Sequence, residues 1–421
     1  MRIGQKFCVV KIVFLTYNGA MFAHSPPITI LRLRWFAAAL LYLLCILLGY
    51  NFIRAYWHLT YAQNWAIWSN ALLICQLGIL WWALKHNHRR NEARLLPTFG
   101  YGNAITLTRG LAVCLLAGFL FAPQPPGLLA WAPSFCYTLA CILDYFDGYV
   151  ARITHHSTVM GEILDMEYDG LGLLIAIGLA IQYGQLPFWY IILGLGRQLF
   201  IFGIWVRKRL GRPVYDLPPS DNRRVIAGFQ MGFISTILWP VFTPPLTTLA
   251  CILFSIPLAG SFGRDWLVVS GLFDAESLRY QTLRRRVKHT LEGWLPLLCR
   301  VAAFGLMIQL MTKSYTAYAA RTAYFAEAPL LLNGLLATLL LLSPIAVALM
   351  LLGVLTRLQA LILTGLTCLD ILANGFQLSS NGVLLAALLW LMQMGGGKWA
   401  LWQPEERILR RRAGEAAHPT T

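Results

Sequence analysis

The sequence predicts an all-α fold: a polytopic helical membrane protein of about twelve transmembrane helices, six of which form a central core. Of its 421 residues, 58% are hydrophobic and 12% are charged, whereas an ordinary soluble domain has about 25% charged residues. Several apolar runs reach the roughly 20 residues that a helix needs to cross about 30 Å of hydrocarbon. A soluble core cannot account for all of these runs.

Twelve runs have about the length of one membrane crossing, and an even number of spans puts both termini on one side. Residues 1–30 contain a short apolar stretch but no convincing cleavage site, so we expect an N-terminal tail. The predicted spans are 35–54, 64–85, 104–123, 128–150, 160–183, 187–207, 225–242, 245–262, 295–313, 329–352, 358–376 and 382–396.

The net charge is +16, and the basic residues cluster between the apolar runs. This pattern favours loops that face an anionic leaflet over a nucleic-acid groove, so we expect membrane lipids and no nucleic acid as partners. With both termini in the cytoplasm of a bacterial-type inner (plasma) membrane, every cluster lies on the cytoplasmic side. The clusters are Arg89, Arg90 and Arg94; Arg207, Lys208, Arg209 and Arg212; Arg284, Arg285, Arg286 and Lys288; and Arg410, Arg411 and Arg412.

Two less apolar stretches divide the chain into four parts. Residues 263–294 are expected to form a cytoplasmic basic linker, and residues 86–100 could form an interfacial helix on the cytoplasmic surface. The predicted parts are 1–99, with the tail, two spans and the interfacial segment; 100–262, the six-helix core; 263–294, the linker; and 295–421, a four-helix membrane unit with a basic tail.

Carboxylates are concentrated at the ends of two neighbouring apolar runs. The chain has 18 Asp and Glu residues, and six of them lie between Asp144 and Asp169. An ionised carboxylate near hydrocarbon is costly unless it is paired, hydrated or bound to a metal. The separations of three between Asp144 and Asp147, and of four between Asp165 and Asp169, put each pair on one helical face.

Two neighbouring helices can therefore point all four carboxylates into one pocket, where divalent cations would relieve their repulsion. Hard oxygen ligands suit Mg²⁺ or Mn²⁺, and Mg²⁺ is commonly held by carboxylates together with substrate phosphates. The sequence thus predicts that Asp144, Asp147, Asp165 and Asp169 hold two divalent ions against a phosphate-bearing substrate. The nine cysteines show no CxxC pair and no Cys/His spacing suited to zinc.

The spacing of these residues resembles the complete signature of the CDP-alcohol phosphotransferase family (CDP-alcohol phosphatidyltransferases). The resemblance covers about residues 100–262 and includes an upstream Asn103, Thr106 and Arg109 like the opening of the family's first core helix. The eight signature positions are Asp144, Asp147, Gly148, Ala151, Arg152, Gly161, Asp165 and Asp169.

The resemblance implies a role for each of these positions. Asp144, Asp147 and Asp165 would be metal ligands, and Asp169 would be the general base. A CDP-binding site would be formed by Asn103, Thr106, Asp144, Gly148, Ala151, Arg152 and Gly161. The resemblance is also compatible with a homodimer.

The acceptor side departs from the family pattern. Where many members have a Gly-Lys-x-x-Thr stretch, this chain has Arg223-Arg224-Val-Ile-Ala-Gly228, so the lysine is absent. Arg223 or Arg224 could supply the charge. Arg109 and Arg197 are further candidates for an acceptor phosphate, with pairing to a carboxylate or to lipid headgroups as the alternative.

Residues of about 295–403 resemble DoxX-like four-helix membrane proteins. The resemblance is carried by Leu351-Leu-Gly353-Val-Leu-Thr356-Arg357 and by Gly395-Gly-Gly397-Lys398-Trp399. Asp370 is the acidic residue placed inside a span here, and it is a candidate for ion, proton or redox chemistry unless it is hydrated at the surface. No activity is assigned to this unit.

The function implied is metal-dependent transfer of a phosphatidyl or related lipid-phosphate group from a CDP-linked lipid to a small alcohol, with release of CMP. Two alternatives remain open. A soluble CDP-alcohol could instead donate its phospho-alcohol to diacylglycerol, or the acidic cluster could bind a cation without turnover in a transporter or scaffold. The transporter reading does not explain Gly148, Ala151 and Gly161 at fixed intervals.

Overall fold

The computed structural model describes residues 27–217, 221–274, 277–324 and 330–410. Within these residues the fold is helical, with no strand and one isolated bridge between Val354 and Trp402. The predicted all-α class is thus confirmed. Most of the predicted N-terminal tail, and Arg411 and Arg412 of the last basic cluster, lie outside the described residues.

Helical segments occupy the twelve predicted ranges, although their ends are shifted. The helices of the N-terminal part and the core are α1 (Pro27–Tyr56), α2 (Leu59–Ala83), α3 (Gly100–Ala117), α4 (Ala132–Ile153), α5 (Val159–Gln182), α6 (Ile191–Gly194), α7 (Gly196–Arg209), α8 (Asp221–Ile237) and α9 (Leu246–Val269). Those that follow are α10 (Leu278–Lys288), α11 (Leu295–Tyr324), α12 (Leu330–Leu352), α13 (Thr356–Asn374), α14 (Val383–Met394) and α15 (Pro404–Arg410).

Five described helices are long and apolar enough to cross a membrane, or six if the bent pair α6 and α7 forms one span. These helices and their composition indicate an integral membrane protein. Helix α5 has 24 residues, which at about 1.5 Å per residue would also reach across the hydrocarbon. It carries four carboxylates, however, and is not among the five helices that meet both criteria. Twelve crossings stay a prediction.

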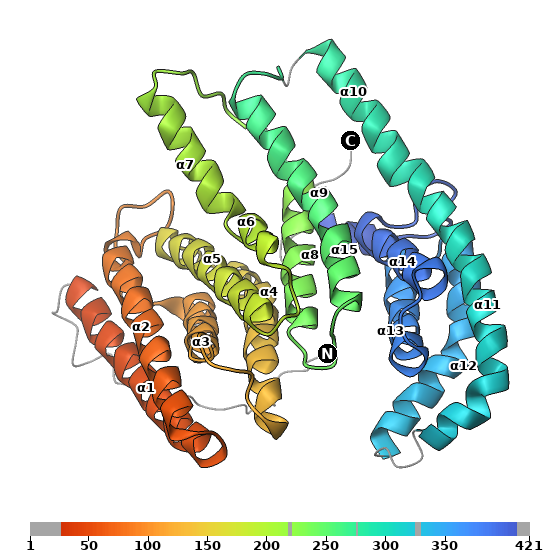
Figure 1. The fold of residues 1–421 in the computed structure, drawn as a ribbon. Coiled ribbons are helices and arrows are strands. Elements are labelled where there is room, and N and C mark those ends of the chain that lie inside the picture. The colour runs from red at the N-terminus through yellow and green to blue at the C-terminus, as the bar shows by residue number, and fades with distance from the viewer. Residues whose placement is uncertain (1–26, 218–220, 275–276, 325–329, 411–421) are drawn as a thin grey trace, which may run out of the picture.

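The core is built around α3, which packs against α2, α4 and α5. Helices α1 and α2 lie side by side at one edge of the molecule (Figure 1). Trp65 of α2 is buried, donates its indole N–H to the Leu115 carbonyl oxygen at 3.1 Å, and lies against Gly118, where α3 ends. Close packing of a large ring on a glycine therefore fixes α2 against α3.

The predicted span 187–207 is wrong as a single straight helix. It is divided into α6 and α7, whose segments meet at an angle of 61° beside Leu195. Gly194 and Gly196 flank the break, and a Cβ at Gly196 would lie 2.8 Å from the Phe262 ring. Glycines on both sides lower the cost of a bend and allow α9 to approach closely.

The interfacial helix suggested for residues 86–100 is also wrong. After a single 3₁₀ turn at Leu84–His86, residues 87–99 form turns and extended chain. The buried Asn87 amide donates to the carbonyl oxygens of Leu96 and Thr98 at 2.8 and 2.9 Å, which closes this loop on itself. A side-chain amide that bridges backbone carbonyls stabilises a compact loop in place of a helix.

The stretch 263–294, predicted as a linker, is largely helical. Helix α9 continues to Val269, and α10 joins α11 through a π-helical turn at His289–Trp294. Helix α10 has no buried residue and projects from the rest of the molecule (Figure 1).

Helices α11 to α14 form a second bundle with its own buried core, which includes Met307, Met350 and Leu388. The bundle packs against the first part of the chain through α14 on α9 and α15 on α8. Arg357 lies at this junction. Its guanidinium donates to the carbonyl oxygens of Met392 and Gln393, pairs with Glu406 at 2.8 Å, and lies 5.3 Å over the Phe229 ring of α8.

Two polar groups inside this bundle bond to its own loops. Asp370 is buried and accepts hydrogen bonds from the side-chain amides of Asn374 at 2.7 Å and Asn381 at 3.2 Å, at the turn between α13 and α14. Arg300 is buried and donates to the carbonyl oxygens of Leu351 and Lys398. Arg300 thereby ties together the loops that carry the two glycine-containing motifs.

We expect Arg300→Met to lower the free energy of unfolding of the C-terminal bundle by about 2 kcal/mol, because two partly buried carbonyl groups lose a charged donor. Thermal unfolding of the full-length protein in detergent, followed by tryptophan fluorescence, measures the change. Arg286→Met, on the exposed helix α10, is the matched control and should leave the melting temperature unchanged. Equal melting of both variants would contradict a bridging role for Arg300.

Candidate active site

The four aspartates of the predicted cluster come from the facing segments of α4 and α5. Asp144 and Asp147 lie near the C-terminal end of α4, and Asp165 and Asp169 lie in the first half of α5. Thr158 starts α5 as its N-cap, because its hydroxyl accepts a hydrogen bond from the Gly161 N–H at 3.1 Å. The α4–α5 hairpin therefore brings the two pairs face to face.

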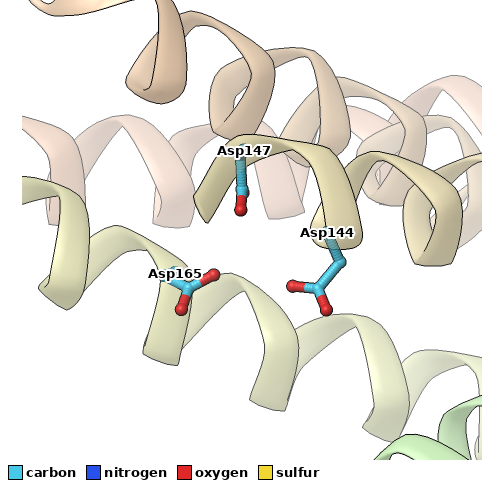
Figure 2. Close-up of side chains that lie close together, drawn as sticks. All are labelled: Asp144, Asp147 and Asp165. Atoms are coloured by element: carbon cyan, nitrogen blue, oxygen red, sulfur yellow. The ribbon is translucent and has the colours of Figure 1, made fainter. Parts of the chain in front are cut away.

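Figure 2 shows Asp144 and Asp147 on one helix and Asp165 on the other, with their carboxylates directed toward one another. One oxygen from each of these three side chains lies within 4.8 Å of the others. Asp147 is buried, whereas Asp144 and Asp165 are partly open. Three converging carboxylate oxygens are a suitable donor set for a hard divalent cation, so this group could hold a metal ion.

Arg109 of α3 lies at the centre of the cluster. Its side chain is only 2% exposed, and its Nη1 hydrogen-bonds Asp144 Oδ1. The same Nη1 lies 3.0 Å from Asp169 Oδ1 and 3.4 Å from Asp147 Oδ2, and Nη2 lies 3.0 Å from Asp165 Oδ1. Of the two predicted roles for Arg109, the structure therefore favours pairing with carboxylates over a free acceptor contact.

The small residues of the motif lie where the three helices approach most closely. A Cβ at Gly102 of α3 would lie 2.7 Å from the Ala151 Cβ of α4. A Cβ at Gly161 of α5 would collide with the Asn103 amide oxygen. A Cβ at Gly148 would lie 3.2 Å from the Arg152 guanidinium of the same helix. The contacts at Gly102 and Gly161 need residues with little or no side chain.

Asn103 and Thr106 are both buried, and each has a partner within the protein. The Thr106 hydroxyl donates to Asp147 Oδ2 at 2.9 Å, and the Asn103 amide donates to Thr158 Oγ1 at 3.2 Å. Thr106 therefore orients one carboxylate of the cluster, and Asn103 holds the residue that caps α5. Direct contact of either residue with a CDP group stays a prediction.

The remaining predicted arginines lie on α7 and α8. Arg197 of α7 reaches α5, where it donates to the Met166 carbonyl oxygen at 3.1 Å and pairs with Glu167 at 3.4 Å. Arg223 of α8 lies 3.6 Å from the Asp265 carboxylate of α9. The side chain of Arg224 lies outside the described part of the structure.

Asp265 was not predicted from the sequence. It is buried in the last part of α9 and pairs with both Arg223 and the neighbouring Arg264. The signal that could have found it is a lone carboxylate next to an arginine at the end of an apolar run. Its pairing shows that the positive charge of Arg223 is partly balanced from the facing helix.

Comparison with known proteins confirms the predicted family for this part of the chain. Residues 99–259 match the family model of CDP-alcohol phosphatidyltransferase. This segment spans α3 to most of α9 and contains all four aspartates. No solved structure matches the chain.

Two curated relatives bear the same name, CDP-diacylglycerol–glycerol-3-phosphate 3-phosphatidyltransferase. The protein from Cereibacter sphaeroides is 34% identical over 116 residues, which cover 26% of this chain and 49% of that protein. The protein from Salmonella choleraesuis is 27% identical over 150 residues, which cover 34% of this chain and 78% of that protein. The chain thus matches about half the length of the first relative.

We expect Gly161→Ala to lower the melting temperature, because the added Cβ meets the Asn103 amide oxygen and the buried Asn103 has little room to move. An overpacked site of this kind costs roughly 1–3 kcal/mol. Gly178→Ala, in the same helix, has room at ordinary contact distance and should be neutral or stabilising. Thermal unfolding of both variants in detergent provides the measurement, and equal effects would show that Gly161 is not a contact point.

Proposed function

We propose that this protein transfers a phosphatidyl group from a CDP-linked lipid to an alcohol and releases CMP, as a step of phospholipid synthesis. The observation that carries the proposal is the convergence of Asp144, Asp147 and Asp165 within a segment that matches the CDP-alcohol phosphatidyltransferase family. We also propose the predicted membrane topology, with the site on the cytoplasmic side. The predicted division into four parts is proposed with two changes: residues 87–99 form a loop, and the basic linker is largely helical.

The proposed donor site lies between α4 and α5. The carboxylate oxygens of Asp144, Asp147 and Asp165 would hold two divalent cations, Mg²⁺ or Mn²⁺, with Asp169 completing the set. When bound, such cations neutralise the diphosphate and stabilise the departing CMP oxygen. Gly148, Ala151 and Gly161 belong to the proposed CDP-binding set as small residues, with Ala151 and Gly161 packed against α3. The Arg152 guanidinium is suited to a phosphate.

The reaction needs alignment and a proton acceptor. The acceptor hydroxyl oxygen attacks the phosphorus that bears the diacylglycerol, and the phosphoanhydride bond to CMP breaks. Asp169 is proposed to take the hydroxyl proton, because it lies one helical turn beyond Asp165 with its side chain partly exposed. Arg109 holds Asp169 in place through its Nη1.

Glycerol 3-phosphate is the proposed acceptor. The printed names of both relatives include this substrate. Arg197 contacts the segment of α5 that precedes Asp169. Arg223 lies in the first turn of α8, close to Asp265 of α9, and both helix ends are proposed to be cytoplasmic. Guanidinium groups bind phosphate well, which supports a phosphorylated acceptor over serine or another neutral alcohol.

The first test is CMP release from CDP-diacylglycerol by the purified full-length protein with Mg²⁺ or Mn²⁺ and a panel of acceptors. We expect release that depends on glycerol 3-phosphate and falls by about 10²–10⁴-fold in Asp169→Asn, because the proton acceptor is lost. Glu162→Gln, on the same helix and paired with the exposed Arg90, is the matched control.

Other outcomes would distinguish the alternatives. Release of CMP only from a soluble CDP-alcohol with diacylglycerol would reverse the donor polarity. Divalent-cation binding without CMP release from any donor, by folded protein, would favour a transporter or scaffold and would exclude the transferase.

A second test concerns the acceptor phosphate. We expect Arg223→Gln to raise the KM for glycerol 3-phosphate by about 10-fold or more, since a charge-assisted contact contributes roughly 1.5–3 kcal/mol. The residual turnover with unphosphorylated glycerol should be unchanged. Arg209→Gln, on the exposed end of α7, is the control. An equal loss with both acceptors would assign Arg223 a structural role through Asp265.

A further inference from the structure

The position of Arg109 leads to an inference about how the carboxylate cluster is held before any metal binds. Its guanidinium contacts one oxygen of each of the four aspartates, and its Nη2 also donates to the Asp165 carbonyl oxygen at 3.2 Å. Arg109 belongs to α3, whereas the aspartates belong to α4 and α5. One side chain thus links the three helices that form the site.

The charges explain why such a link is needed. Four carboxylates at this spacing repel one another strongly, and the repulsion grows where water is scarce. A guanidinium carries a permanent charge and a planar fork of five N–H donors, so it can serve several carboxylates at once. A lysine ammonium at the same position could not span all four.

The same carboxylates are the ones that divalent cations would use. Arg109 contacts Asp144 Oδ1, Asp147 Oδ2 and Asp165 Oδ1, which belong to the three side chains that could hold a metal ion. Two cationic partners that neutralise the same charges are redundant: each stabilises the protein less when the other is present.

We propose that Arg109 is the built-in counter-ion of the cluster, which keeps the metal-free site assembled and sets how much stability a divalent cation can add. The inference rests on the proposed metal site. Because the guanidinium already offsets part of the negative charge, cation binding adds less stability to the native protein than it would to a protein without Arg109.

The proposal predicts that Arg109 reduces the stabilisation that Mn²⁺ gives to the protein. Arg109→Gln should lower the melting temperature of the metal-free protein by on the order of 10 °C, since four buried or half-buried carboxylates lose their shared partner. The rise in melting temperature on adding Mn²⁺ should be about twofold larger in Arg109→Gln than in the native protein.

The experiment uses the full-length protein in detergent, with EDTA or a series of Mn²⁺ concentrations. Melting is followed by tryptophan fluorescence, and bound Mn²⁺ is counted separately by electron paramagnetic resonance. Arg109→Lys should fall between the native protein and Arg109→Gln. Arg90→Gln, which removes the exposed guanidinium paired with Glu162 of α5, is the matched control and should leave the Mn²⁺ effect unchanged.

A charge-removal variant separates electrostatics from packing. Adding Asp144→Asn to Arg109→Gln removes one negative charge and should restore part of the metal-free stability, whereas a defect caused by lost packing would not recover. The double variant also keeps the test informative if Arg109→Gln alone does not fold.

The contrary outcomes are distinct. If Mn²⁺ stabilises the native protein and Arg109→Gln equally, the counter-ion role is overturned while the metal site stands. Failure of the double variant to recover any stability relative to Arg109→Gln also overturns it. If Mn²⁺ neither binds nor stabilises the native protein, the proposed metal site fails, and the inference fails with it.

Discussion

The gathering of four aspartates on two adjoining helices is the constraint on which the rest of the site depends. Their repulsion would separate α4 from α5 unless cations are present, and Arg109 supplies one from α3. Arg109 is buried, and an unpaired buried charge would destabilise the fold. The guanidinium and the aspartates therefore neutralise each other. This pairing links the three helices at the site, in addition to the buried apolar core that they share.

Close helix packing makes these contacts reachable. Gly102 against Ala151 and Gly161 against Asn103 bring the backbones of α3, α4 and α5 close enough for Arg109 and Thr106 to reach carboxylates on the neighbouring helices. Larger residues at these positions would move the helices apart by the width of a methyl group or more. The small residues of the motif therefore act on the geometry of the cluster as well as on access to it.

The added segments pack against the core at its edges. The α1–α2 pair covers α3 through Trp65, while the C-terminal bundle contacts α8 and α9 through α15 and α14. Arg357 joins the bundle to Phe229 of α8, the helix that also carries Arg223. These contacts connect the bundle to α8 and α9, whereas the carboxylates lie on α4 and α5.

The sequence by itself determined the helical class, the approximate helix positions and the acidic motif, because hydrophobic run length and carboxylate spacing are local properties of the chain. It also identified the family of residues 99–259. The bend at Leu195, the compact loop after His86, the buried Asp265 and the central place of Arg109 were decided only by the tertiary structure. Each depends on a partner distant in the chain, such as Phe262 beside Gly196 or Asp165 beside Arg109, and spacing along one helix carries no information about such partners.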